Sequence, residues 1–153
     1  MEMIRKWAMP NKETFKIKPI KQLIKQEKIF GEICDPFPYP YKEDALKYMK
    51  SFKDNSVIFG LYDPPYSLRQ LKECYESKGL ALTMHETQSY WNDIDKEWDR
   101  IIKPGGKVIK FGWNSKRLSK SFEIKKIMLV NHGGNHNDTI CTIQTKVIGD
   151  LYV

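Results

Sequence analysis

The 153-residue sequence predicts an α/β fold in which parallel strands alternate with helices and an antiparallel hairpin comes last. The first indication is the nearly all-apolar run at residues 56–62 (SVIFGLY), which is typical of a central strand covered on both faces. Helix-period patterns flank this run at residues 42–52 and 86–102. Two β-rich runs, at residues 122–130 and 139–147, are separated by a glycine-containing loop and predict the hairpin.

The first third of the chain begins with residues 1–16, which we expect to form an irregular arm. A helix is predicted from Pro19 to Gln26, because a proline in the first turn loses no helical hydrogen bond. Residues 28–34 (KIFGEIC) predict a short strand. The three prolines that follow it exclude regular structure until the next helix pattern begins.

The later elements complete the alternation of strands and helices. Residues 67–77 predict a further helix, which a nearby glycine stops. A turn at residues 103–106 (KPGG) leads into a strand at residues 107–112. Ligands of such sheets bind at the carboxyl ends of the parallel strands. Asp35 and Asp63 directly follow predicted strands, so the sequence predicts a site near these two acids.

Composition limits the class of protein. A hydrophobic content of 41% with 12% aromatic residues excludes a mainly disordered chain, and the length predicts a single domain over residues 1–153. No apolar run approaches the roughly 20 residues that cross a bilayer, so no membrane span is expected. Cys34, Cys74 and Cys141 form no CxxC pair, which predicts a reduced cytoplasmic protein without a disulfide framework or a structural zinc site.

The net charge of +7 is unevenly distributed along the chain. Residues 1–31 carry 8 basic and 3 acidic groups, residues 101–130 carry 8 and 1, and the segment between them is acidic. Two interpretations stay open: a phosphate-binding surface for nucleic acid, or a solvated lysine-rich surface. For nucleic acid, the expected phosphate contacts lie in the second basic block: Lys116, Arg117, Lys120, Lys125 and Lys126.

The motif Asp63-Pro64-Pro65-Tyr66 directly follows the predicted central strand. Neither proline has an N–H group, and both restrict the backbone, so the carbonyl of Pro64 is free to face outward beside the Asp63 carboxylate. Two adjacent acceptors suit an exocyclic NH₂ group, and Tyr66 offers a ring on which a base can stack. The alternative is a plain strand-ending turn, since Asp-Pro is common in loops, but the strand context favours a site.

Residues 58–66 (IFGLYDPPY) resemble the catalytic motif of the DNA amino-methyltransferases, which form N6-methyladenine or N4-methylcytosine from S-adenosyl-L-methionine. Residues 44–50 and 54–57 resemble the segment before that motif, and residues 100–109 resemble the turn into the following strand. The resemblance implies a Rossmann-like S-adenosylmethionine-dependent methyltransferase fold. It also implies a catalytic site at Asp63, Pro64, Pro65 and Tyr66. Arg69 lies just after this turn, and we expect it to contact the backbone of a flipped nucleotide.

Two shorter segments resemble the cofactor-binding parts of this family. Lys18-Pro19 resembles the start of the helix beside the methionine end of the cofactor, and Asp35-Pro36-Phe37 resembles the start of its glycine-rich loop. The glycines of that loop are absent here, and Asp44 follows too soon for the usual helix and second strand. We therefore expect a shortened fold in which Asp44 or Glu43 replaces the acid that holds the ribose. No metal is expected, because the positive charge of the methyl donor already activates its leaving group.

The sequence most closely resembles small adenine-specific methylases of phage and prophage type. Residues 7–11 (WAMPN), 112–115 (GWNS) and 132–139 (HGGNHNDT) carry this resemblance. It implies a DNA N6-adenine methyltransferase of phage or prophage origin, with DNA as its partner, in the cytoplasm of a prokaryotic host. No segment is long enough for a separate target-recognition domain, so we expect low or short-site sequence specificity.

Three other functions stay open on the sequence alone. One is N4-cytosine methylation, and a second is methyl transfer to a non-DNA amino group such as a glutamine side-chain amide. The third is a catalytically reduced, methyltransferase-like protein that binds DNA or the cofactor, which the missing glycines favour. A homodimer or a partner subunit would complete the shortened pocket.

Two further groups of residues have a structural interpretation. The spacing of His132, His136 and Asp138 suits metal ligands. A metal site needs at least three ligands that converge on one point, and the sequence does not show a third ligand converging with two others. We expect these three residues to form a polar network that satisfies the tight Gly-Gly turn. Trp91 and Trp98 lie on one face of a predicted helix, which favours core packing over base stacking.

Overall fold

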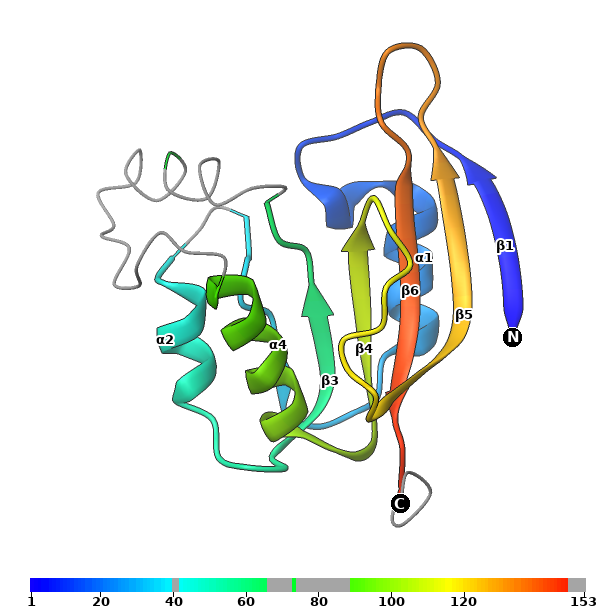
Figure 1. Ribbon diagram of the computed structural model, residues 1–153. Helices are drawn as coiled ribbons and strands as arrows, with labels where there is room; N and C mark the ends of the chain where they lie inside the picture. The colour runs from blue at the N-terminus through cyan, green and yellow to red at the C-terminus, as the bar shows by residue number, and fades with distance from the viewer. Residues whose placement is uncertain (40–41, 66–72, 74–88, 149–153) are drawn as a thin grey trace.

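The computed structural model describes residues 1–39, 42–65, 73 and 89–148. The strands are β1 (Glu2–Trp7), β2 (Ile33–Cys34), β3 (Val57–Tyr62), β4 (Ile102–Gly112), β5 (Phe122–Asn131) and β6 (Thr139–Lys146). The helices are the 3-10 turn η1 (Thr14–Lys16), α1 (Lys18–Glu27), α2 (Ala45–Lys50) and α4 (Ser89–Ile101). These six strands form one sheet, in the order β1-β5-β6-β4-β3-β2 (Figure 1).

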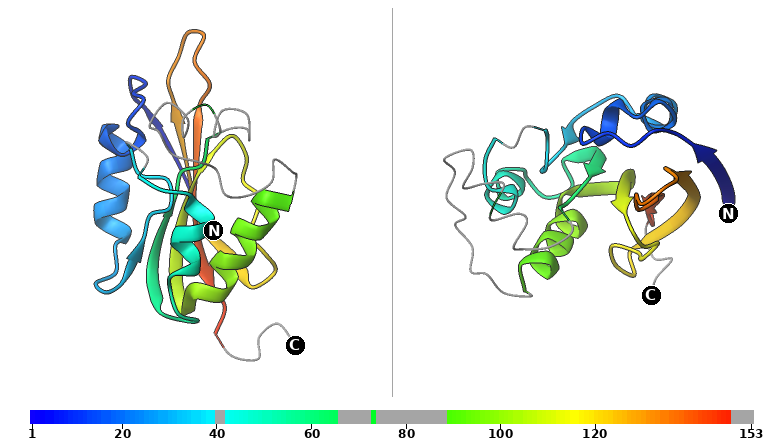
Figure 2. Two further views of the ribbon diagram at one scale, coloured as in Figure 1. Left: turned by 90° about the vertical axis from the view of Figure 1, so that its left-hand side faces the viewer. Right: turned by 90° about the horizontal axis from the view of Figure 1, so that it is seen from above.

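The sheet lies between two layers of helix. α1 covers one face, and α2 and α4 cover the other (Figure 2). β2, β3 and β4 are parallel neighbours, whereas β6 runs antiparallel between β4 and β5. The α/β class, the parallel centre and the C-terminal antiparallel hairpin predicted from the sequence are therefore confirmed.

α1 forms where the sequence predicts it, with Pro19 in its first turn and Leu23 buried on the sheet. At its last residue, the Glu27 carboxylate pairs with the Lys107 amine at 3.0 Å and with the Lys126 amine at 2.9 Å. These ion pairs join the end of α1 to β4 and β5. Lys126 is thus held against α1 by an ion pair, and its role as a phosphate contact stays a prediction.

The N-terminal arm differs from the sequence-based expectation. Instead of an irregular segment, residues 2–7 form β1, which pairs in parallel with β5. Most side chains of β1 are exposed, and only Ile4 is partly buried against the core. No alternation of apolar and polar residues therefore marks this strand, and its partner lies near the other end of the chain.

Two strand boundaries also differ. β2 covers only Ile33–Cys34 rather than residues 28–34, because the chain turns at Gly31 and leaves Phe30 fully exposed. β4 begins at Ile102 and so includes the turn expected at residues 103–106. Its pairing with β3 shifts register there, so the turn residues form an irregularity within the strand.

The helix predictions on the other face agree in position but not in length. α2 begins at Ala45 rather than at residue 42, because Asp44 caps it by accepting a hydrogen bond from the Leu46 amide at 3.2 Å. α4 ends at Ile101, one residue earlier than predicted. The helix predicted at residues 67–77 lies almost wholly outside the described residues.

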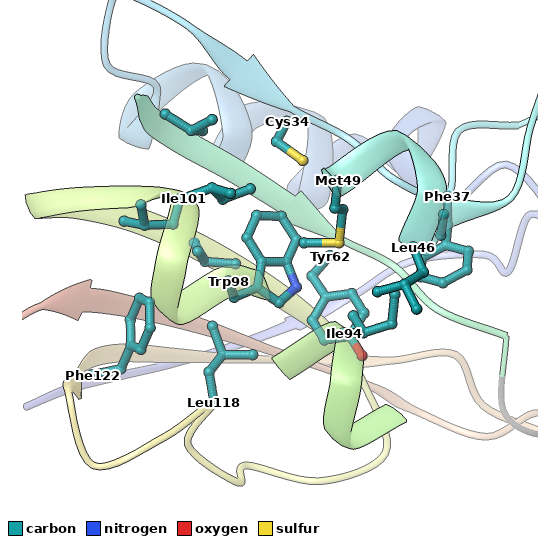
Figure 3. Packing of buried hydrophobic residues seen from close by; sticks show 14 of the residues in the cluster. Cys34, Phe37, Leu46, Met49, Tyr62, Ile94, Trp98, Ile101, Leu118 and Phe122 are labelled. Carbon is teal, nitrogen blue, oxygen red and sulfur yellow. The ribbon is translucent and has the colours of Figure 1, made fainter. Parts of the chain in front are cut away.

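The larger core cluster lies between the sheet and the helices α2 and α4 (Figure 3). Trp98 is fully buried, and its ring centroid lies 5.5 Å from that of Tyr62. Gly60 on β3 lies directly against the Trp98 indole. Trp91 is partly buried against the same cluster. The core packing predicted for the two tryptophans is therefore confirmed.

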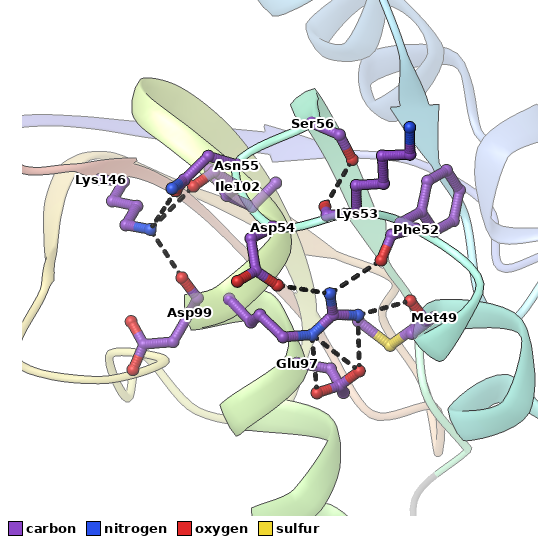
Figure 4. Close-up of polar contacts among 11 residues, drawn as sticks. Met49, Phe52, Lys53, Asp54, Asn55, Ser56, Glu97, Asp99, Ile102 and Lys146 are labelled. Atoms are coloured by element: carbon purple, nitrogen blue, oxygen red, sulfur yellow. Dashed lines mark hydrogen bonds and ion pairs between the residues drawn. The ribbon is translucent and has the colours of Figure 1, made fainter.

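Arg100 connects α4 to the end of α2, near the start of β3 (Figure 4). Its guanidinium donates to the main-chain carbonyls of Met49 at 3.1 Å and Phe52 at 2.7 Å. It also forms ion pairs with Asp54 at 2.9 Å and Glu97 at 2.8 Å. The side chain thus adds charged donors to two carbonyls at the end of α2, where the Met49 carbonyl also accepts from the Phe52 amide at 3.1 Å.

Replacing Arg100 by Met is expected to lower the free energy of unfolding by about 2 kcal/mol, because the carbonyls lose a charged donor and Glu97 loses its partner. Urea denaturation at pH 7 measures the change. Arg100→Lys is the matched control, since it keeps the charge but not the planar fork, and should recover only part of the loss. A Met variant as stable as the original chain would show that these contacts do not stabilise the fold.

Candidate active site

β2 and β3 are parallel neighbours, so their carboxyl ends lie at the same edge of the sheet. Asp35 follows β2, and Asp63 follows β3. At this edge, the negative charge of Asp63 contributes to raising the pKa of Asp35. The structure therefore brings together the two acids that the sequence singles out.

Asp63 is held where the chain leaves β3. Burial raises the pKa of its carboxyl group from 3.8 to about 6, and a hydrogen bond from the Thr14 side chain acts in the opposite direction. Thr14 belongs to η1, so the segment before α1 reaches the motif at the end of β3. A carboxyl group that titrates near neutral pH suits both hydrogen-bond acceptance and proton transfer.

Asp35 is the second acid of the site. Burial raises the pKa of its carboxyl group to about 6, the Asp63 charge adds to this, and Lys42 opposes it. The Oδ1 atom of Asp35 is buried and has no hydrogen-bond partner within the described part of the chain. A buried acceptor without a donor is uncommon in proteins, and a ligand that carries donors would satisfy it.

Replacing Asp35 by Asn is expected to stabilise the protein by about 2 kcal/mol at pH 8 and to change nothing at pH 3. The pKa of Asp35 is higher in the folded chain than in the unfolded chain, so burial of this acid costs no stability below about pH 4, where the carboxyl group is protonated in both states. Stability is lost as the pH rises through about 6. Asn carries no charge and escapes this loss. Urea denaturation at both pH values measures the difference, and equal stabilities at pH 8 would contradict it.

A hollow of about 220 Å³ opens beside Asp35, and we call it the Asp35 hollow. Its lining residues are Asp35, Pro36, Pro38, Lys42, Glu43 and Tyr48. S-adenosylmethionine offers a sulfonium cation, an ammonium group and ribose hydroxyls. The unpartnered oxygen of Asp35 and the exposed carboxylate of Glu43 fit the cationic and donor groups of this molecule.

Two residues expected at the cofactor from the sequence serve the core instead. Phe37 is 2% exposed, and its ring packs against those of Tyr62 and Trp91, with centroids 6.1 Å from each. Asp44 is 4% exposed, caps α2, and accepts a hydrogen bond from the Tyr90 hydroxyl at 2.9 Å. Its carboxylate is therefore not presented to a ribose in this structure.

Lys18 and Pro19 lie at the start of α1, on the other face of the sheet from α2. Lys18 is exposed, and Pro19 lines a groove with Ile4 and Met128. Neither residue lines the Asp35 hollow. Their assignment to the cofactor stays a prediction from the resemblance.

A second hollow, of about 270 Å³, lies beside Pro64 and Pro65, and we call it the Pro64–Pro65 hollow. Trp91 from α4 and Trp113 after β4 contribute aromatic side chains to its wall. An acid and a base lie there too, since the lining also includes Asp95, whose pKa burial raises to about 6, and Lys110, whose pKa burial lowers. Aromatic walls with a few polar groups suit a flat heterocyclic ring.

The sequence-based prediction missed Trp113, Asp95 and Lys110 as residues of this site. For Trp113, its place in the sequence could have predicted this role. It directly follows β4, the third of the parallel strands whose carboxyl ends form this edge of the sheet. Asp95 and Lys110 carry no such signal, since each becomes a lining residue only when α4 packs beside β4.

Three of the five predicted basic contacts lie on the loop after β4, and the other two lie on β5. Lys116, Arg117 and Lys120 are exposed, and Lys116 also lines the Pro64–Pro65 hollow. Buried Gln144 holds this loop: its side-chain oxygen accepts from the Leu118 amide at 2.9 Å, and its nitrogen donates to the Lys116 carbonyl at 3.1 Å. Two other predicted contacts, Tyr66 and Arg69, lie outside the described residues.

The hairpin loop forms the predicted polar network around His132 and Asp138, whereas His136 contributes its main-chain amide, which donates to the Gly133 carbonyl at 3.3 Å. The buried ring of His132 lies 2.9 Å from the Ala8 carbonyl and 2.8 Å from the Thr139 hydroxyl. Asp138 accepts hydrogen bonds from the His132 amide at 3.1 Å and from the Asn131 side chain at 2.8 Å. Across the described ranges, no group of three or more His, Cys, Asp or Glu side chains is arranged to hold a metal ion.

Comparisons with known proteins returned little. No protein family model matches the chain, and no curated protein sequence matches it. A solved structure described as a "putative type 11 methyltransferase from Sulfolobus solfataricus" is similar over 99% of this chain and 88% of its own, with 14% identity and a TM-score of 0.42.

The strand order itself defines the fold class. An α/β sheet with parallel β2, β3 and β4 and an antiparallel β6 between β4 and β5 has a shortened Rossmann-like arrangement. Within the described residues, every helix is too short or too polar to cross a membrane.

Proposed function

We propose that this protein is a DNA N6-adenine methyltransferase, which transfers the methyl group of S-adenosylmethionine to the exocyclic amino group of a flipped base. The observation that supports this best is the position of Asp63-Pro64-Pro65 at the carboxyl end of β3. The Pro64–Pro65 hollow lies beside the two prolines, and the Asp35 hollow lies at the neighbouring strand end. Such an edge is where α/β folds bind their ligands.

The two hollows suggest which part of the reaction each serves. The target base must leave the duplex stack, at a cost of a few kcal/mol, before its amino group can be reached. Trp113, which is 49% exposed, offers an aromatic surface for that base in the Pro64–Pro65 hollow, and exposed Lys116, which also lines the hollow, offers a positive charge for a phosphate. Tyr66 and Arg69 keep the stacking and backbone roles expected of them from the sequence.

The chemistry follows from the two acceptors of the motif. The Asp63 carboxylate and the Pro64 carbonyl accept the two amino hydrogens, which keeps the nitrogen lone pair free to attack. S-adenosylmethionine supplies the methyl group, and the rest of the donor leaves as a neutral thioether. Asp63, with its pKa of about 6, is ionised at pH 8, stabilises the positive charge that develops on the nitrogen, and accepts the released proton.

Methyl transfer to DNA of defined sequence tests the proposal. The chain is incubated with methyl-labelled S-adenosylmethionine and unmethylated duplex DNA, and the product nucleosides are separated. We expect labelled N6-methyldeoxyadenosine. Labelled N4-methyldeoxycytidine would instead support the cytosine alternative, and DNA without label would overturn the proposal. Sequencing of the modified DNA should show a short recognition site, since a long and strict site would contradict the low specificity expected.

A catalytically reduced binding protein is the second candidate, and the shortness of the segment after β2 favours it. α2 starts at Ala45, soon after the prolines, and Asp44 is buried, so the described residues place no second-strand acid near a ribose. Calorimetry with S-adenosylmethionine separates the candidates. Binding supports the enzyme, and no heat at millimolar concentration supports the reduced protein.

A further inference from the structure

β1 is the last strand at one edge of the sheet, and no described element lies outside it (Figures 1 and 2). An uncovered edge strand presents main-chain N–H and C=O groups that pair with another strand. Large apolar side chains gather at this edge: Met3 is 73% exposed, Trp7 is 66% exposed, and Met9 is 69% exposed. Exposed apolar groups in one place mark an interaction surface.

The hydrogen-bonding pattern shows which main-chain groups of β1 face outward. The Ala8 amide, just after the strand, donates to the Asn131 carbonyl of β5 at 3.0 Å. Main-chain groups alternate between the two sides of a strand, so the amides and carbonyls of Met3, Arg5 and Trp7 point away from β5. They are the groups that an added strand would meet.

We propose that two copies of this protein form a dimer by antiparallel pairing of β1 with the partner's β1, so that the two sheets join into one. A two-fold axis through Ile4 places Glu2 opposite the partner's Lys6, and Lys6 opposite the partner's Glu2. Met3 then pairs with the partner's Arg5 through the outward main-chain groups. Ile4 and Glu2 fall at the non-hydrogen-bonded positions, where facing side chains lie closest.

Charge selects this register over its neighbours. The outward-facing main-chain groups belong to Met3, Arg5 and Trp7. Symmetric pairings of two β1 strands therefore differ only in which residue lies on the two-fold axis, and neighbouring registers move that axis by one residue. An axis through Arg5 would place two like charges directly opposite each other, which is destabilising. An axis through Met3 would leave Lys6 without an acidic partner across the strand. The axis through Ile4 alone forms two pairs of opposite charge.

The dimer has a consequence for the candidate active site. Because β1 runs parallel to β5 and antiparallel to the partner's β1, the carboxyl ends of the two sheets face opposite directions. Both copies of the Asp35 hollow and the Pro64–Pro65 hollow stay open. This dimer therefore does not complete the shortened pocket, and the inference does not depend on the proposed function.

Charge reversal tests the register directly. Sedimentation of the untagged chain is expected to show a concentration-dependent species of about 36 kDa, twice the chain mass of 18.1 kDa. Lys6→Glu sets two acids opposite each other at both symmetric positions, and Glu2→Lys does the same with two bases. Each variant should raise the dimer dissociation constant by about tenfold, and the double variant Glu2→Lys/Lys6→Glu should restore it to within about threefold.

Two further variants separate the interface from folding and from net charge. Lys53→Glu makes the same charge change in an exposed turn far from β1 and should leave dimerisation unchanged. Met3→Pro removes an outward N–H while keeping the pairing with β5, and should give a folded monomer by circular dichroism. A wild-type chain that stays monomeric up to its solubility limit would overturn the proposal. So would a dimer that tolerates both single reversals, or a double variant that stays weak.

Discussion

Replacing Asp63 by Ala is expected to reduce methyl transfer to DNA by at least about 10³-fold, because the amino group loses its charged acceptor. The fold should persist, because burial disfavours the charged form of Asp63 and the substitution removes that buried charge. At pH 8 the Ala variant should therefore unfold at the same urea concentration as the original chain or a higher one. Initial rates of label transfer and a urea melt on the same preparation measure both effects. Methylation at the original rate would remove Asp63 from the mechanism.

The conservative variant Asp63→Asn tests whether charge or shape matters. The wild-type rate should fall as the pH drops through about 6, because a protonated Asp63 no longer stabilises positive charge or accepts a proton. Asn keeps an acceptor oxygen but does not titrate, so its lower rate should vary little over this range. Asp35 titrates in the same range, so Asp35→Asn is the control, and its methylation rate should still fall as the pH drops through about 6. A fall that persists in Asp63→Asn would assign it to another group.

Replacing Gly60 by Ala is expected to lower the free energy of unfolding by about 3 kcal/mol. A methyl group at this position would lie 2.8 Å from Cη2 of Trp98 and closer still to Cζ3, inside the contact distance of two carbons. β3 and Trp98 are both fully buried here, so neither can move away freely. Urea denaturation measures the loss.

A second substitution shows whether Trp98 is the cause of that loss. Trp98→Phe removes the outer part of the indole that the methyl group meets, together with a buried Nε1 that has no partner among the described residues. The double variant Gly60→Ala/Trp98→Phe should therefore be more stable than the sum of the two single effects, by about 1 kcal/mol or more. Additive effects would place the strain elsewhere in the core.

Local patterns were enough for the elements that lead to the candidate site. The apolar run of β3, the first-turn proline of α1 and the β-rich runs of the hairpin each carry a signal within a few residues. The strand ends then place Asp35 and Asp63 at one edge, because parallel strands share an edge for their carboxyl ends. The polar network around His132 also follows from a short segment with a tight turn.

The sequence alone thus determined the α/β class, the position of the acidic motif after β3 and the final hairpin, since these depend on neighbours in the chain. Only the tertiary structure decided that residues 2–7 form a strand, because β1 exists through main-chain pairing with β5 and has no apolar pattern of its own. It also decided that Asp44 and Phe37 are buried and that Asp95 and Lys110 line the Pro64–Pro65 hollow. Such contacts join side chains far apart in the sequence, and packing, rather than periodicity, sets which of them meet.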